Sequence, residues 1–316
     1  MKKYTLGKTG IKVSELCFGA LTLGPIQADI SAKKGAKVIR AALEKGINFI
    51  DTAEVYQTYP HIKKALEGYH GEVIITTKSD AKTYKKMEKS INEALEALNR
   101  DYIDIFLLHA AKATSSVFEE RAGAFQCLKD YKSKGTIRAI GISTHAVEVV
   151  NRASEIEEID IIFPIINKIG LGIVGGSTSD MIKAISKAGK AGKGLYAMKA
   201  LGGGRLIGEL ESSINFVRNI SDINSVAIGM ISEDELELNI KIFNNEEISQ
   251  EIIDKRIKPN KKLFISRFCI GCGICVKTCP NKALSLIDGK AVVNHDLCIL
   301  CGYCNPVCPV FAIRLI

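Results

Sequence analysis

Long apolar runs are missing from this sequence. No uncharged stretch approaches the roughly 18 to 20 residues that a membrane helix needs, and charged residues make up 25% of the 316 residues. The first residues, Met1 to Gly7, have a positive flank but no apolar segment of the kind found in secretory signals. We therefore expect a soluble, cytoplasmic protein with no membrane partner.

A concentrated basic region is missing as well. The formal net charge is +8, but lysines and acidic residues are interspersed along the chain, and no basic block carries stacking aromatics. Because binding to nucleic acid depends on such a surface, we expect no nucleic-acid partner.

Cysteine is scarce in most of the chain and dense near its end. Only Cys17 and Cys127 precede a group of eight cysteines between Cys269 and Cys308. In a reducing cytoplasm, that density indicates metal or redox chemistry rather than disulfides. Cys17 and Cys127 each lie in an apolar run, and we interpret both as unreactive core residues.

From Lys3 to about Asn244, short β-branched runs alternate with amphipathic helical stretches. Eight such pairs in this length predict an α/β fold, a TIM (β/α)8 barrel; a doubly wound open sheet is the alternative. The segment from Tyr4 to Val13 predicts a hairpin that closes the barrel bottom. The predicted strands are Glu15 to Ala20, Asn48 to Ala53, Val73 to Ser79, Tyr102 to His109, Ile137 to Thr144, Ile159 to Asn167, Gly194 to Leu201 and Ser225 to Met230.

Two helix starts can be read directly. Ser31 is placed to cap a helix that runs to Gly46, and Ser232 to Glu235 reads as a capping box that opens the last barrel helix. We predict a barrel over residues 1–244, a charged linker with Pro259 over 245–262, and a second, small domain over 263–316.

The small domain contains one cysteine pattern twice. Both copies read C-x2-C-x2-C-x3-C-P, whereas zinc sites usually use two Cys pairs with a long spacer. In this pattern the fourth cysteine reaches the other cluster, so we predict two [4Fe–4S] clusters. The predicted ligands are Cys269, Cys272, Cys275 and Cys308 for one, and Cys298, Cys301, Cys304 and Cys279 for the other. From Leu263 to Ile316 the sequence closely resembles a bacterial-type two-cluster ferredoxin, which implies a small α+β domain.

Polar residues end three consecutive predicted strands. Asp51 closes the second strand and is followed by Tyr56, Lys78 closes the third, and His109 closes the fourth. Since catalytic residues of TIM barrels lie where the strands end, we expect these four side chains to meet. A nearby ammonium group favours a phenolate, so we expect Lys78 to lower the pKa of Tyr56, with Asp51 holding Lys78.

These motifs resemble the aldo/keto reductase family over about 240 residues. The resemblance rests on Gly10 to Ser14 before Phe18-Gly19, on Asp51 to Tyr56, on Lys78 and His109, and on Gly141 to Ser143. It implies that Asp51, Tyr56, Lys78 and His109 form a catalytic tetrad in which Tyr56 is the acid that protonates a carbonyl oxygen.

The resemblance also implies a nicotinamide site. Ser143 and Asn167 match the residues that grip the carboxamide, but Phe163 replaces the usual glutamine and Met198 replaces the usual stacking aromatic. Met198-Lys199 followed by Gly202 to Gly204 resembles the iron–sulfur-containing branch of the family. The cofactor residues that we predict are Ser143, Asn167, Lys199, Gly203, Gly229 and Ser232.

We therefore expect an iron–sulfur oxidoreductase that reduces a carbonyl or oxidises an alcohol in the barrel, with clusters that relay electrons to or from a partner protein. NAD(H) or NADP(H) is the expected cofactor; Glu233 would repel the 2′-phosphate of NADP. A hydride carries two electrons and each cluster one, so a flavin between them is the second possibility. The third is an electron carrier with an idle barrel.

Overall fold

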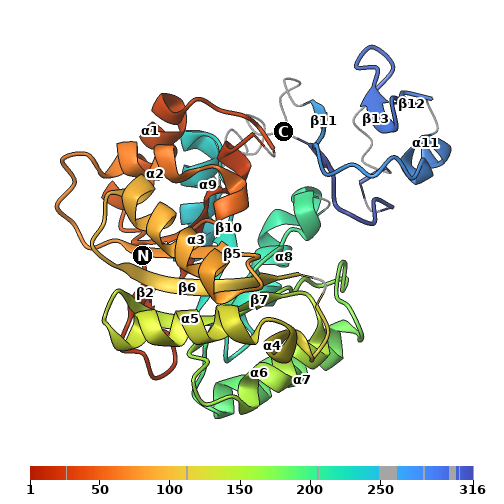
Figure 1. Ribbon diagram of the computed structural model, residues 1–316. Helices are drawn as coiled ribbons and strands as arrows, with labels where there is room; N and C mark the ends of the chain where they lie inside the picture. The colour runs from red at the N-terminus through yellow and green to blue at the C-terminus, as the bar shows by residue number, and fades with distance from the viewer. Residues whose placement is uncertain are drawn as a thin grey trace.

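The protein folds into a barrel followed by a smaller cysteine-rich unit (Figure 1). The computed structural model describes residues 1–25, 27–111, 113–204, 206–248, 262–279, 282–298, 304–305 and 307–315. No helix in these ranges is long and apolar enough to cross a membrane. The predicted linker falls largely outside them, and Cys301 does also.

Eight parallel strands close into a barrel, which confirms the predicted fold class and excludes the open sheet. Neighbouring strands are consecutive in the chain, and the last strand pairs with the first. The barrel strands are β3 (Leu16–Gly19), β4 (Phe49–Asp51), β5 (Ile74–Ser79), β6 (Ile103–Ala110), β7 (Ile137–Thr144), β8 (Ile161–Pro164), β9 (Gly194–Ala197) and β10 (Ser225–Ile228).

Helices surround the barrel because each buries one apolar face against the strands. They are α1 (Ala32–Glu44), α2 (Tyr59–Leu66), α3 (Tyr84–Leu98), α4 (Val117–Glu120), α5 (Ala122–Ser133), α6 (Val147–Glu155), α7 (Thr178–Lys190), α8 (Leu210–Arg218) and α9 (Glu233–Asn244). Short 3₁₀ segments are η1 (Ala20–Leu23), η2 (Glu54–Tyr56), η3 (Gly202–Gly204) and η4 (Ile207–Glu209).

The predicted hairpin is present as β1 (Lys3–Thr5) and β2 (Lys12–Ser14). Its apolar residues Leu6, Ile11 and Val13 are buried in the same cluster as the side chains that fill the barrel interior. The hairpin therefore closes the barrel bottom, and the carboxyl ends of the strands stay available for a site.

Several boundaries differ from those predicted. Strand β9 ends at Ala197 rather than Leu201, because Lys199 adopts a left-handed conformation with φ of 60°, which interrupts a strand.

Ser31 caps α1 as predicted. Ser232 also caps α9, but the Glu235 carboxylate accepts from the N–H of Ile231 rather than that of Ser232, so the capping box is incomplete.

The cysteine-rich unit is built from two small antiparallel pairs and one short helix. Strand β11 (Leu263–Ile265) pairs with β14 (Ile313–Leu315), and β12 (Leu284–Ile287) pairs with β13 (Lys290–Val293). Helix α11 (Ile274–Thr278) lies between β11 and β12 in the chain. Cysteine side chains form part of its apolar core.

Candidate active site

Asp51 and Lys78 form a buried ion pair at the carboxyl ends of β4 and β5. The Lys78 ammonium donates to both Asp51 oxygens, at 2.8 and 2.7 Å, and to the carbonyl of Thr52 at 2.6 Å. Burial lowers the pKa of Lys78 and raises that of Asp51, and the opposite charge of each partner counteracts the shift. The pair therefore fixes one cation beneath the barrel mouth.

Tyr56 lies beside this cation, at the end of η2. The Lys78 ammonium is 5.1 Å from the centre of the Tyr56 ring. We expected Lys78 to lower the pKa of Tyr56, and that prediction is wrong: burial, and then the charge of Asp51, raise the pKa of Tyr56 above its usual value. The Lys78 hydrogen bonds are directed at Asp51 and Thr52, so the phenol of Tyr56 keeps its proton at neutral pH.

His109 completes the group from β6. Its ring meets the Tyr56 ring edge-on, with centroids 5.8 Å apart. Burial, followed by the charges of Lys78, Arg121 and Lys199, lowers the pKa of His109 to about 3. The imidazole is therefore neutral, and a neutral ring can donate one hydrogen bond. The four residues predicted as a tetrad are thus gathered at three successive strand ends; their catalytic roles stay predictions.

Two aromatic residues lie beneath this group: Phe163, and Tyr196, which was not singled out from the sequence. The Tyr196 hydroxyl donates to Asp51 at 2.9 Å, and the Tyr196 ring stacks on Phe163 at 3.8 Å between centroids. The Lys78 ammonium is 5.2 Å from the centre of the Phe163 ring. Phe163, which replaces the family's glutamine, thus belongs to the barrel interior and supports the ion pair.

The predicted carboxamide residues are in different situations. Ser143 on β7 is buried and directly opposite His109 in the strand register. The Asn167 amide instead closes its own loop, because it donates to the carbonyl of Leu171 and accepts from the Leu171 N–H, both at 2.9 Å. Ser143 is therefore placed next to the tetrad, while the side chain of Asn167 is already engaged.

The remaining predicted cofactor residues follow β9 and β10. Lys199 and Gly203 lie after β9, and both have positive φ. Gly229 follows β10, and a side chain there would meet Thr22, since an added Cβ would lie 2.2 Å from Thr22 Cγ2. Ser232 uses its hydroxyl as the α9 cap. Their binding to a cofactor stays a prediction.

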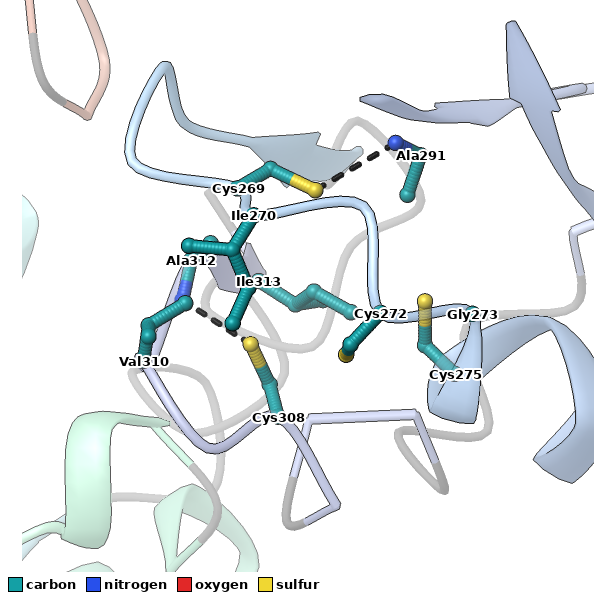
Figure 2. Close-up of a pocket in the computed structure, with 10 residues that line it drawn as sticks. All are labelled: Cys269, Ile270, Cys272, Gly273, Cys275, Ala291, Cys308, Val310, Ala312 and Ile313. Atoms are coloured by element: carbon teal, nitrogen blue, oxygen red, sulfur yellow. Dashed lines mark hydrogen bonds between the residues drawn. The ribbon is translucent and has the colours of Figure 1, made fainter. Parts of the chain in front are cut away.

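Four cysteines line one pocket of the small unit. They are Cys269, Cys272, Cys275 and Cys308, the set predicted for the first cluster (Figure 2). Backbone N–H groups donate to the sulfurs of the first and last of these cysteines in the chain. The N–H of Ala291 donates to Cys269 at 3.3 Å, and that of Ala312 donates to Cys308 at 3.1 Å. Such N–H···S bonds are typical around iron–sulfur clusters and tune their potentials. The arrangement of these residues therefore fits a cluster.

Of the second predicted set, the structure describes Cys279, Cys298 and Cys304. Cys279 accepts a hydrogen bond from the N–H of Ala283 at 3.3 Å. These three cysteines pack against, or belong to, the same apolar core as the first set. Ligation of clusters by both sets stays a prediction.

Comparison with known proteins agrees with both halves of the chain. The model of the aldo/keto reductase family matches residues 15–244. The chain belongs to the aldo/keto reductase family. The model of a 4Fe-4S dicluster domain matches residues 268–312, which supports iron–sulfur clusters in the small unit. The chain therefore combines a barrel of this family with a ferredoxin-type domain.

Relatives of this aldo/keto reductase include L-galactose dehydrogenase of Arabidopsis thaliana, 34% identical over 154 residues, which are 44% of this chain and 47% of that protein. Aldo-keto reductase YhdN of Bacillus subtilis is 28% identical over 180 residues, 52% and 53% of the two chains. The chain thus spans about half the length of the curated relatives it matches. The structure of aldo-keto reductase AKR11C1 from Bacillus halodurans shares the fold, with a TM-score of 0.65 and 21% identity over 82% of this chain and 97% of that one.

The ferredoxin-type domain contacts the mouth of the reductase barrel through Phe311. The Phe311 ring centre lies 4.8 Å from the Lys199 ammonium and 6.3 Å from the centre of the His145 ring. A Cβ on Gly172 would lie 2.6 Å from Phe311 Cζ, so the absence of a side chain at Gly172 leaves room for the ring. Phe311 therefore covers residues that follow β7, β8 and β9. Its N–H donates to the carbonyl of Cys308, a predicted cluster ligand.

Proposed function

We propose that the protein reduces a carbonyl group, or oxidises the corresponding alcohol, at the mouth of its barrel. The observation that carries the proposal is the gathering of Tyr56, Lys78, Asp51 and His109 at three successive strand ends. Four residues with these chemistries form one group with a fixed cation, a protonated phenol and a neutral imidazole.

Each side chain has a distinct part in this reaction. Asp51 holds the Lys78 ammonium, and Tyr196 in turn holds Asp51. His109, which is neutral, donates a hydrogen bond to the substrate oxygen and orients it. Tyr56 transfers its hydroxyl proton to that oxygen as negative charge develops on it. In the reverse direction the same oxygen of Tyr56 accepts the proton from the alcohol.

A nicotinamide cofactor, when bound, supplies the hydride that reaches the carbonyl carbon. Ser143 supports this assignment, since it is buried beside His109. Two of the usual contacts are altered, because Phe163 stacks in the barrel interior and Asn167 closes its own loop. Glu233 in the first turn of α9 favours NAD(H) over NADP(H), because its carboxylate would repel the 2′-phosphate.

We further propose that clusters in the ferredoxin-type domain relay electrons between the barrel and a redox partner protein. The turn from Cys308 to Phe311 connects a predicted cluster ligand to the barrel mouth. Two clusters that carry one electron each match the two electrons of one hydride. Separating the hydride into single electrons requires a centre such as a flavin, and this electron count favours a ferredoxin-linked flavoenzyme as the second candidate.

The assignment of Tyr56 is tested by Tyr56→Phe in the cluster-containing protein under anaerobic conditions. The substrates are a panel of aldehydes and ketones with NADH or NADPH. Because general acid catalysis contributes on the order of 10² to 10⁴ in rate, we expect kcat/KM to fall by that factor. Tyr59→Phe is the matched control, because the Tyr59 hydroxyl is also buried but bonds only to Thr77 among the described residues. Full activity of Tyr56→Phe contradicts the proposal.

The choice between the two candidates is tested by extraction. Protein purified without oxygen is denatured, and the supernatant is analysed for flavin by fluorescence. Release of stoichiometric flavin supports the flavoenzyme, and release of none removes it.

A further inference from the structure

One short segment of the ferredoxin-type domain, residues 308–313, borders both the cysteine pocket and the barrel. Most of its residues line the pocket, as Figure 2 shows: Cys308, Val310, Ala312 and Ile313. Phe311 lies between two of them in the chain, but its ring contacts the barrel instead. The same segment therefore carries a predicted cluster ligand and the ring that reaches the barrel mouth.

The backbone of Phe311 is held in a conformation that residues other than glycine seldom adopt. Its φ is 52°, in the left-handed region where a Cβ atom is crowded. Two hydrogen bonds to Cys308 hold this turn. The Phe311 N–H donates to the Cys308 carbonyl at 3.2 Å, and the Ala312 N–H donates to the Cys308 sulfur at 3.1 Å. Because a strained conformation persists only where its surroundings hold it, the direction of the Phe311 ring depends on Cys308.

The ring is seated among residues that follow three barrel strands. Its centre lies 4.8 Å from the Lys199 ammonium and 6.3 Å from the centre of the His145 ring. A Cβ added to Gly172 would lie 2.6 Å from Phe311 Cζ and 2.8 Å from Ile165 Cδ1. The ring therefore occupies space that a side chain at position 172 would need.

Gly172 belongs to the loop over residues 168–176, which follows β8. The loop is held to its neighbour by backbone hydrogen bonds, from the Val174 N–H to the His145 carbonyl at 2.9 Å and from the Val147 N–H to the Val174 carbonyl at 3.0 Å. Ordering a loop that contains glycine costs conformational entropy. A ring packed on this loop should therefore reduce its local opening, and the exchange of its amide protons reports whether the ring is seated.

We propose that occupation of the first cluster site covers this part of the barrel mouth, because the turn at Cys308 then holds Phe311 on the 168–176 loop. A bound cluster has Cys308 as a thiolate, and a charged acceptor strengthens the N–H···S bond from Ala312. Without the cluster the turn relaxes and the ring leaves the loop. This regulation rests on the proposed function, since it takes the barrel mouth as the place of reaction.

The test is hydrogen–deuterium exchange with mass spectrometry on the whole chain, prepared without oxygen with its clusters and again after iron removal by a chelator. Ring contacts of this kind are equivalent to about a tenfold change in a local opening equilibrium. In the wild type we therefore expect peptides over 168–176 to exchange about tenfold or more faster after cluster removal. In Phe311→Ala they should exchange fast with the clusters present, and cluster removal should add nothing. Phe311→Leu, which keeps an apolar side chain, should show an intermediate increase.

Two controls accompany the test. The β1–β2 hairpin at the other end of the barrel should exchange equally in all samples, and Ile287→Ala, at an exposed position of β12, should behave like the wild type. The proposal is overturned if cluster removal leaves the exchange of the loop unchanged in the wild type. It is also overturned if removal accelerates exchange by the same factor in Phe311→Ala, because the coupling then does not pass through the ring. The measurement involves no turnover, so either result leaves the assignment of Tyr56 standing, and an active Tyr56→Phe variant refutes the catalytic proposal alone.

Discussion

Replacement of Lys78 by methionine should destabilise the barrel strongly. The Lys78 ammonium makes three short hydrogen bonds, and the side chains of Lys78 and Asp51 are only 1% and 6% exposed. In Lys78→Met, Asp51 keeps the Tyr196 hydroxyl but loses its cation, and the Thr52 carbonyl loses its donor. Breaking a buried pair from one side costs about 3–5 kcal/mol. We expect a loss of that size in the free energy of unfolding.

The assay is anaerobic urea unfolding followed by far-ultraviolet circular dichroism. Lys132→Met is the matched control, because the Lys132 ammonium approaches Asp160 just as closely, at 2.7 and 2.6 Å, but the side chains are 35% and 20% exposed. Partly exposed pairs contribute about 0–1 kcal/mol. Removing both charges in Lys78→Met with Asp51→Asn should recover part of the loss. Equal costs for Lys78→Met and Lys132→Met would refute the reasoning.

Two further predictions concern His109 and Phe311. Native His109 stays neutral with a pKa of about 3, whereas an unfolded histidine titrates near 6.5, so protons bind the unfolded state and native stability falls below pH 6.5. Because of His109, the free energy of unfolding of the wild type falls by about 1.4 kcal/mol per pH unit in this range. His109→Gln lacks this titration, so the difference in free energy of unfolding between the wild type and the variant should change in favour of the variant by about 2 kcal/mol between pH 6.5 and 5. The same difference at every pH in urea unfolding would contradict this. Phe311→Ala removes the ring that contacts Lys199 and His145, and a misplaced reacting group can cost up to about 10²-fold. Electron exchange between substrate and clusters, measured by stopped-flow absorbance, should slow by about tenfold or more, whereas Ile287→Ala, at an exposed position of β12, should match the wild type.

The architecture was predictable because it depends on local patterns. Apolar runs separated by amphipathic stretches are sufficient to indicate a barrel, and the strand-ending residues Asp51, Lys78 and His109 follow from the same pattern. The repeated cysteine spacing likewise indicates clusters without any knowledge of the fold. In each case residues close in sequence carry the whole signal.

Features that depend on contacts between distant segments were not predictable. Tyr196 is 145 residues from Asp51 in the chain, so no spacing links the hydroxyl to the carboxylate. Its only sequence signal was a tyrosine inside an apolar strand. The contact of Phe311 with Lys199 depends on how the two domains dock. The pKa of Tyr56 was predicted in the wrong direction because burial and Asp51 outweigh the Lys78 charge, which is directed elsewhere.

The central claim is that the barrel site and the clusters form one electron-transfer unit. Its most direct test is to mix the protein, with oxidised clusters, with added flavin to separate the hydride into single electrons and without oxygen, with NADH or NADPH and to follow the visible absorbance of the clusters. The account predicts that the cluster absorbance bleaches and recovers when a carbonyl substrate is added. Clusters that stay oxidised with both reductants, although dithionite reduces them, would contradict the account.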